Sequence, residues 1–282
     1  MKKVIINADD FGLSKGVNEG IILAHQKGIL TSTSLMANMP GFAHAVELAK
    51  KNVKLGVGIH LNIVRGRPLS PVNRVSSLLD KDKNFFSNIF IILRKLWSKK
   101  INKQEIELEF RAQIEKILKN KIQISHFDSE KHIHCLPSLL KIVLKLGKEY
   151  NIKRIRYINE YCITPRLLQS AKTIFASLSC LSMKEKIIED GILKPDRSYG
   201  IGRSGQMTSP RIKKILSNLK DGVTEIMVHP GFVTQELMDL EKEIGSFYIN
   251  RYREKELKAL LDQDIKKIIS DKEIGLINFN QL

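Results

Sequence analysis

Short apolar segments typical of β-strands alternate with amphipathic helical segments along almost the whole chain. The strand-like segments are Val4 to Ala8, Thr31 to Met39, Leu55 to Val64, Ile122 to His126, Ile152 to Tyr157, Ser198 to Ile201, Val223 to Val228 and Ile274 to Phe279. The helical segments are one that Ser14 caps and Gly28 ends, Phe42 to Lys51, Gln104 to Leu118, Ser138 to Tyr150, 165–195, Pro210 to Leu219 and Arg251 to Leu261. This alternation predicts an α/β fold with a mostly parallel sheet, and the count fits a TIM-like (β/α) barrel of roughly seven or eight strands.

The region between Arg65 and Lys100 interrupts this alternation with prolines and a small apolar patch. An interruption of this length in an α/β chain often forms a lid or contacts a substrate. We therefore expect one barrel domain over residues 1–282, with an insertion or lid at about residues 65–100. The aromatic side chains of the patch would close the lid or form a homodimer contact; they are Phe85, Phe86, Phe90 and Trp97.

The segment His126 to His134 (HFDSEKHIH) has a metal-binding or proton-handling side chain at every second position. In an extended backbone, side chains two residues apart point to the same face of the strand. The residues on that face would be His126, Asp128, Glu130, His132 and His134. Imidazole and carboxylate groups together suit zinc and other first-row divalent metals, or magnesium where few imidazoles take part. The alternation therefore indicates a functional site rather than a solvated edge strand.

Three further polar clusters follow or end apolar strand segments: Asp9-Asp10, His60 and His229. The carboxyl ends of parallel barrel strands converge on one mouth, so we expect all four clusters to surround one ion. The side chains of adjacent aspartates diverge. One carboxylate would therefore bind the metal, and the other would accept a proton from water that the metal activates. His229 would approach from the far side and protonate the leaving group, which is the layout of an amide or ester hydrolase.

The chain is strongly basic, with a net charge of +17 from 47 Lys and Arg against 30 Asp and Glu. Such a surface can attract nucleic acid, anionic lipid or an anionic glycan. No zinc finger, RNA-binding aromatic signature or compact Arg-rich tract accompanies the charge, so we expect no nucleic-acid partner. Solvated, lysine-rich helix faces are the simplest explanation, and weak association with an anionic membrane is the alternative.

Three cysteines, Cys135, Cys162 and Cys180, lie far apart without a C-x-x-C pair, which fits a reducing compartment and inert thiols. A thiolate ligand at Cys135 is disfavoured, because its position alternates with the histidines rather than matching them. The first residues are too short for a signal-peptide core, and no segment approaches the ~18 apolar residues of a membrane span. These features predict a cytoplasmic protein.

Four motifs occur in order along the chain: residues 7–12 (NADDFG), 58–62 (GIHLN), 126–137 and 227–232 (MVHPGF). Shorter matching segments lie at residues 14–20, 31–33, 203–205 and 221–225. Together they closely resemble the YdjC-like carbohydrate deacetylase family over nearly the whole chain. The resemblance implies a variant (β/α) barrel related to polysaccharide deacetylases. It also implies a divalent metal, usually magnesium or zinc, and removal of an acetyl group from an N-acetylated sugar.

Position by position, the resemblance implies that Asp9 is the general base and that Asp10 and His60 bind the metal. The third ligand of the family is a histidine in the pattern H-x-D-[SG]-H, and this chain has Glu130 at that position. A carboxylate in place of an imidazole should favour harder metals that prefer oxygen. The alternatives are that His132 is the third ligand or that activity has been lost. We favour retained binding of one divalent ion, with magnesium or zinc ahead of manganese or cobalt.

Other polar residues near these motifs are expected to orient the ligands or to face the substrate. His126 and Asp128 would orient metal ligands, and His134 would do the same or be a buried, hydrogen-bonded side chain. Arg156, at the end of its strand-like segment, would contact a substrate hydroxyl or carboxylate, or form an ordinary salt bridge. If Glu130 is the third ligand, His132 joins this outer group.

These observations predict a metal-dependent N-deacetylase that acts on an N-acetylated amino sugar or a small glycoconjugate. A metal-dependent phosphoesterase is one alternative, although such sites often hold more metal ions and need more ligands at the first strand than Asp9-Asp10 supply. A non-catalytic glycan- or lipid-binding protein is the other, because Glu130 and the basic surface permit it. The charge and the insertion favour an anionic or membrane-associated acceptor.

Overall fold

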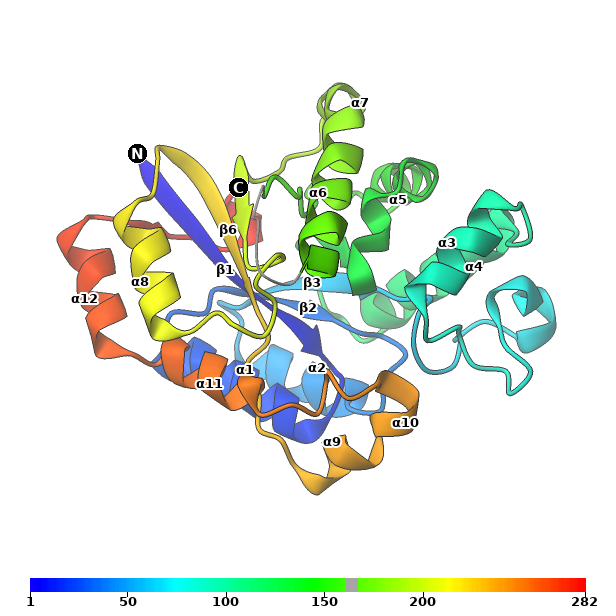
Figure 1. Ribbon diagram of the computed structural model, residues 1–282, viewed down its shortest axis with the longest axis horizontal. Coiled ribbons are helices and arrows are strands. Elements are labelled where there is room, and N and C mark those ends of the chain that lie inside the picture. Colours follow the sequence, from blue (N-terminus) through cyan, green and yellow to red (C-terminus); the bar gives the residue numbers. More distant parts are fainter. Residues whose placement is uncertain (161–166) are drawn as a thin grey trace.

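The computed structural model describes residues 1–160 and 167–282, and its centre is one sheet of seven parallel strands (Figure 1). The strand order is β4-β3-β2-β1-β6-β5, and β7 pairs with the start of β1. The strands are β1 Lys2–Phe11, β2 Ser32–Leu35, β3 Gly56–Leu61, β4 Phe127–Ser129, β5 Arg197–Tyr199, β6 Gly222–Val228 and β7 Gly275–Leu276. The parallel α/β class predicted from the sequence is therefore confirmed.

The sheet is curled but open, so the predicted closed barrel is confirmed only as a half-barrel of parallel strands. Within residues 1–160 and 167–282, the edge strands β4 and β5 do not pair with each other. The expected strand Ile152 to Tyr157 is reduced to two isolated bridges, Phe127 with Ile155 and Arg154 with Leu193. These bridges still place residue 156 beside β4, because its backbone N–H donates to the carbonyl of Phe127, the first residue of that strand, at 2.8 Å.

Helices surround the sheet and connect its strands (Figure 1). They are α1 Lys15–Lys27, α2 Phe42–Lys51, α3 Ile89–Trp97, α4 Lys103–Lys119, α5 Pro137–Glu149, α6 Leu167–Ser182, α7 Lys184–Glu189, α8 Ser209–Ser217, α9 Gln235–Asp239, α10 Glu241–Ile244, α11 Tyr252–Leu260 and α12 Gln263–Asp271. Short 3₁₀ helices are η1 Val72–Arg74, η2 Ser76–Leu78, η3 Glu130–Cys135 and η4 Phe279–Gln281.

The predicted helix boundaries hold where a cap or an amphipathic stripe defines them. The Ser14 side chain accepts a hydrogen bond from the Val17 N–H at 3.3 Å, which caps α1. Gly28 ends that helix, and a Cβ there would lie 2.4 Å from the Leu260 carbonyl oxygen. The predicted helices that became α2, α4, α5, α8 and α11 agree with the structure within two residues. The expected helix 165–195 is divided into α6 and α7, and its first two residues lie outside the described residues.

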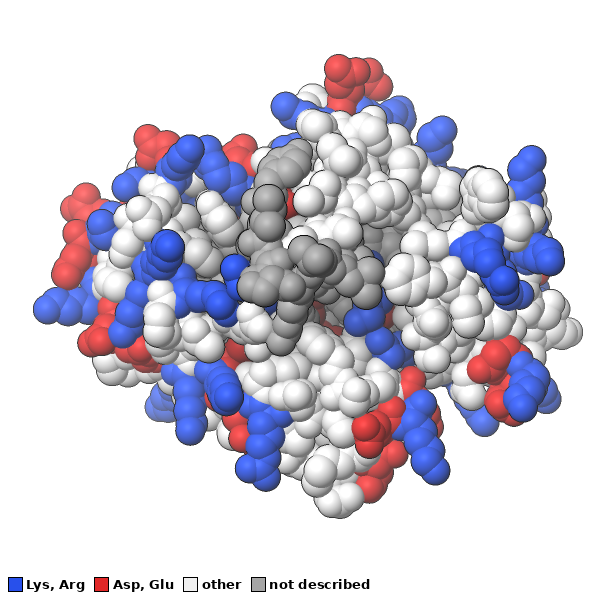
Figure 2. All heavy atoms as spheres, viewed as in Figure 1, with Lys and Arg blue, Asp and Glu red and all other residues white. Residues whose placement is uncertain are grey.

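The interruption at residues 65–100 contains η1, η2 and the unpredicted helix α3. Its aromatic residues differ in exposure: Phe85 is buried, whereas Phe90 is 52% exposed and Trp97 is 89% exposed. No helix among the described residues is long and apolar enough to cross a bilayer. Lys and Arg are spread over the face shown in Figure 2, with Asp and Glu among them.

The sheet brings the four polar clusters to one edge. Asp9 and Asp10 lie in the last part of β1, and His60 lies near the end of β3. Glu130 and His229 are the first residues after β4 and β6. All of these strands are parallel, so their carboxyl ends lie on the same side of the sheet, as the sequence predicted.

Candidate active site

A backbone irregularity at the end of β1 places Asp9 and Asp10 on the same pocket. The register of β1 against β2 shifts by one residue between Ala8 and Phe11. Asp10 has a left-handed φ of 70°, which a residue with a side chain adopts at an energetic cost. Both carboxylates line one cavity, although the alternation of a regular strand would point them to opposite faces.

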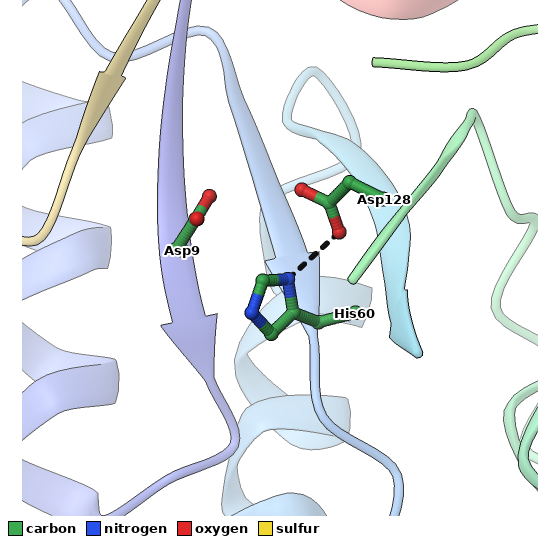
Figure 3. A group of neighbouring side chains, drawn as sticks. All are labelled: Asp9, His60 and Asp128. Atoms are coloured by element: carbon green, nitrogen blue, oxygen red, sulfur yellow. Dashed lines mark hydrogen bonds and ion pairs between the residues drawn. The ribbon is translucent and has the colours of Figure 1, made fainter. Parts of the chain in front are cut away.

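His60 lies beside Asp128, its register partner on β4 (Figure 3). His60 Nδ1 contacts Asp128 Oδ1 at 2.7 Å, and Ser34 Oγ donates to Asp128 Oδ2 at 2.6 Å. Burial alone lowers the pKa of His60, but the Asp128 and Glu130 carboxylates hold that pKa well above its ordinary value. The other ring nitrogen of His60, Nε2, lies 3.5 Å from Glu130 Oε2. A carboxylate behind one ring nitrogen is how many proteins orient a metal-binding histidine.

The predicted extended segment from His126 to His134 is wrong beyond Ser129. The ladder between β3 and β4 ends at the pair Leu61 and Ser129, and η3 follows immediately. Within η3, Lys131 and His132 have left-handed φ values of 53° and 57°. The five alternating side chains therefore do not share one face.

The five residues fall into two groups in the structure. Glu130 and His132 line the cavity, whereas His126, Asp128 and His134 are buried behind it and do not line it. Asp128 contacts His60 directly, and its role in orienting a metal ligand stays a prediction. Substrate contact by His126 or His134 is not supported by this placement.

Glu130 is a buried carboxylate that already has several positive or hydrogen-bonding partners. Arg65 Nε donates to Glu130 Oε1 at 3.0 Å, and Tyr248 Oη donates a short hydrogen bond to the same oxygen. Lys131 Nζ lies 3.6 Å from Oε1. Burial raises the pKa of Glu130, but the positive charges of Lys131 and Arg65 hold that pKa well below its ordinary value. Glu130 is therefore an ionised oxygen donor facing His60.

Arg156 forms salt bridges, which was one of the two alternatives predicted for it; the other was contact with a substrate. Its Nη2 and Nη1 donate to the two oxygens of Asp9 at 2.6 and 2.9 Å. Nη1 also lies 2.9 Å from Asp128 Oδ2, and Nε donates to Glu225 Oε1 at 2.8 Å. Arg156 is 1% exposed and does not line the cavity. Burial raises the pKa of Asp9, but Arg156 and His60 together hold that pKa below its ordinary value.

Three histidines near the site, the buried His126 and His134 and the partly buried His132, have pKa values far below the ordinary value. Burial is the main cause in each case, with values of about 3 for His126, about 3 for His132 and about 4 for His134. The His126 ring stacks on Phe279 at a centroid distance of 3.6 Å. His134 Nδ1 contacts Ser129 Oγ at 2.6 Å, which matches the buried, hydrogen-bonded alternative. His132 Nδ1 is buried without a hydrogen-bond partner.

Cys135 and Cys180 are free thiols in contact, with 2.9 Å between their sulfur atoms. Burial and the neighbouring Cys180 raise the pKa of Cys135 well above its ordinary value, so the thiol is protonated at neutral pH. Cys162 lies outside the described residues.

His229 follows β6, on the opposite side of β1 from β3. Its backbone N–H donates to Glu256 Oε2 at 2.6 Å, and its Nδ1 lies 3.8 Å from the same oxygen. The rings of Phe247 and Tyr252 contact the imidazole edge-on, at centroid distances of 5.9 and 6.2 Å. His229 lines the cavity, so it can exchange a proton with a molecule bound there.

The cavity has a volume of about 370 Å³ and an ionisable floor. Two overlapping trios of residues offer ligand atoms within 4.8 Å of one another: Asp9, His60 and Asp128, and Asp10, His60 and Glu130. Both oxygens of Asp128 already contact neighbouring side chains, and Asp128 does not line the cavity. All three members of the second trio line the cavity, and they are the ligands predicted from the sequence. Two carboxylates and an oriented imidazole suit a divalent cation, so the donor set fits.

The sequence did not reveal the positive groups that balance these carboxylates. They include Arg65, which pairs with Glu130, and Arg253, whose Nη2 donates to Asp10 Oδ2 at 2.6 Å. Tyr248 and Glu256 were missed in the same way. Arg253, Tyr248 and Glu256 lie in regions without an apolar strand pattern, so no local signal separates them from surface residues.

Fold and site together define a parallel α/β protein with a buried, cation-competent cluster of acids at its strand ends. The chain belongs to the YdjC-like protein family, whose model matches residues 3–271.

Curated relatives align with the chain over nearly its whole length. A protein named carbohydrate deacetylase from Brevibacillus brevis is 36% identical over 99% of both chains. A protein of the same name from Clostridium beijerinckii is 35% identical over 99% of this chain and 100% of its own.

A crystal structure from Enterococcus faecalis V583 is similar in fold, with a TM-score of 0.79 and 27% identity over 99% of this chain and 98% of that one. That protein is provisionally assigned as a cellobiose-phosphate cleavage protein.

Proposed function

We propose that this protein is a metal-dependent hydrolase that removes the acetyl group from an N-acetylated amino sugar or a small glycoconjugate. The names of the curated relatives support the carbohydrate and the acetyl group as the reacting parts. The main support for the proposal is that one cavity is lined by Asp9, by His229 and by a trio of side chains that can hold a cation. Acetate and a free amine would be the products.

Asp10, His60 and Glu130 would hold one divalent cation, with magnesium or zinc ahead of manganese or cobalt. Such a cation polarises an acyl oxygen and makes water a usable nucleophile near neutral pH. Two carboxylates and one imidazole favour the oxygen-preferring metals of this group. Glu130 rather than His132 is proposed as the third ligand, because only Glu130 brings an atom into the compact trio with Asp10 and His60.

Asp9 would act as the general base. Arg156 contacts both of its oxygens, and Asn7 Nδ2 donates to Oδ1 at 3.1 Å, so the carboxylate is fixed in one orientation. Arg156 also keeps Asp9 ionised, and an ionised carboxylate is ready to accept a proton. Arg156 is thus a positioning residue, and it acts through Asp9.

His229 would give a proton to the departing amine. It approaches from β6, whereas the proposed ligand His60 approaches from β3 on the other side of β1. An acid and a base on different strands can serve opposite ends of the bond that breaks. The contacts with Phe247, Tyr252 and Glu256 hold the imidazole in place.

Two substitutions test the division of labour between the adjacent aspartates. Asp9→Asn should keep metal affinity but lose acetate release from N-acetylglucosamine oligomers, whereas Asp10→Asn should lose both. Asp271→Asn, at an exposed position, is the matched control and should change neither. Release of acetate by Asp9→Asn at the wild-type rate would exclude the mechanism.

The same assay addresses the two alternatives. The wild-type protein should be tested on a panel of acetylated sugars with magnesium, manganese, zinc and cobalt. Absence of acetate release from every sugar would favour a non-catalytic glycan- or lipid-binding protein. Two or more bound metal ions per chain, with hydrolysis of phosphate esters, would favour the phosphoesterase.

A further inference from the structure

Above an acidic floor formed by Asp9, Asp10, His60, Glu130 and His229, the outer wall of the cavity is mostly apolar. The apolar side chains that line it include Ile89, Phe90, Leu93, Leu136 and Phe175. Apart from the floor, the polar side chains of the lining are those of Lys131, His132, Ser179, Ser204 and Tyr248. A free oligosaccharide presents hydroxyls around the edge of each of its rings, and this wall offers few partners for them.

One side of this wall is α3, from the insertion between β3 and α4. Phe90, Leu93 and Trp97 are spaced at i, i+3 and i+7, so they form one stripe along the helix. Phe90 and Leu93 line the cavity, and Trp97 continues the stripe outward with 89% of its surface exposed. The stripe therefore leads from the reaction site to the outside of the molecule.

The other side of the wall is α6. Phe175 lines the cavity and is 54% exposed, and Leu178 and Leu181 follow at intervals of three residues with about half of their surface exposed. Figure 2 shows uncharged surface over α6 that continues towards α3. Exposed apolar side chains that are continuous with a binding cavity mark a ligand surface more often than isolated ones do.

We infer that the substrate is amphiphilic: the acetylated sugar occupies the acidic floor, and an apolar aglycone leaves the cavity between α3 and α6. This inference rests on the proposed function, since it names the substrate class of the same site. The exposed Arg94, Lys99 and Lys100 surround the outer end of α3, and they suit the anionic lipids among which such a glycolipid would lie. On this inference, the insertion at residues 65–100 recognises the aglycone through α3.

The test is a series of N-acetylglucosaminides that differ only in the aglycone: methyl, butyl and octyl, each kept below its micelle concentration. Each methylene that becomes fully buried strengthens binding by about fourfold. We expect kcat/KM to be at least about tenfold higher for the octyl than for the methyl glycoside, since two buried methylenes suffice for that ratio. Phe90→Ser and Phe175→Ser should bring the ratio close to one. Val53→Ser, at an exposed apolar position outside the cavity, should keep the wild-type ratio.

Equilibrium binding of the same glycosides by calorimetry separates this inference from the proposed function. If no glycoside is hydrolysed but affinity still rises with chain length, the proposed function fails and the aglycone surface stands. If the methyl glycoside is hydrolysed as well as the octyl one and affinity is independent of chain length, the aglycone surface is excluded. Binding to anionic vesicles without a chain-length effect, or a dimer that Phe90→Ser dissociates, would assign this face to another partner and overturn the inference.

Discussion

Glu130 is open to two explanations that a double substitution can separate. It is either a metal ligand or only the anion that balances Arg65, whose Nε lies 3.0 Å away. Glu130→Gln keeps the shape of the side chain and removes its charge. Adding Arg65→Gln removes the opposite charge, so the double variant has the same net charge in the site as the wild type.

The two explanations predict the same effect on stability. The Glu130 and Arg65 side chains are only 3% and 7% exposed. Removing one partner of a buried pair leaves an uncompensated charge and typically costs about 3–5 kcal/mol. Urea unfolding in the presence of a chelator should therefore show a loss of that size for Glu130→Gln. Most of the loss should be recovered in the double variant, because no buried charge then lacks its partner.

Metal affinity separates the explanations. A single charge pair 4 Å apart is worth about 4 kcal/mol at an effective dielectric constant of 20. We therefore expect Glu130→Gln to lose at least about 100-fold in affinity for Mn²⁺, measured by calorimetry. If Glu130 is a ligand, the double variant has the same defect although its charge balance is restored. A double variant with wild-type Mn²⁺ affinity would refute the assignment. Glu149→Gln, which breaks the exposed pair with Arg111, is the control and should leave Mn²⁺ affinity unchanged.

Two further predictions concern the buried surroundings of the site. Burial raises the pKa of Glu225 from 4.5 to about 7. Between these pH values the folded state holds a proton that the unfolded state releases. Binding of this proton stabilises the folded state at low pH, and the stabilisation is lost as pH rises through 7. The free energy of unfolding of the wild type relative to Glu225→Gln should fall by about 3 kcal/mol from pH 4.5 to 7.5, and a difference independent of pH would contradict this reasoning. Gly58→Ala would place a carbon 2.2 Å from the His126 ring, which also stacks on Phe279. Urea unfolding should therefore show a loss of about 1–3 kcal/mol, whereas Gly275→Ala, with only ordinary contacts, should lose less.

The sequence predicted the site well where strand ends carry the chemistry. The apolar segments before Asp9, His60 and His229 are buried strands, and the parallel arrangement alone brings their ends to one edge. The roles of these residues remain predictions, but their proximity follows from the fold. Helix boundaries were also predictable where a local cap exists, as at Ser14, since the signal and its effect lie within one turn.

Prediction failed where backbone conformation departs from the pattern of side chains. The alternation from His126 to His134 indicated one extended strand, but the chain turns at Glu130 through left-handed residues. Lys and His give no warning of such a conformation, which glycine would have signalled. The prediction of a closed barrel failed for a related reason. The segment around Ile155 has the apolar character of a strand but forms only isolated bridges.

Contacts between distant segments could not be predicted from one sequence. Asp10 and Arg253 are 243 residues apart, and Glu130 and Tyr248 are 118 apart. Each arginine or tyrosine looks like an ordinary surface residue in its own segment. Only the packing of α11 and the preceding loop against the strand ends gives them a role.

These distant contacts explain how a buried cluster of acids is compatible with a stable fold. Each carboxylate of the proposed base and ligands has its own guanidinium: Arg156 for Asp9, Arg253 for Asp10 and Arg65 for Glu130. Unpaired, such charges would cost several kcal/mol each, whereas paired and hydrogen-bonded charges are tolerated. A cation is thus not needed to neutralise the site during folding. In the proposed function the cation acts in the reaction itself, and Arg65 supplies the positive charge that balances a carboxylate at position 130.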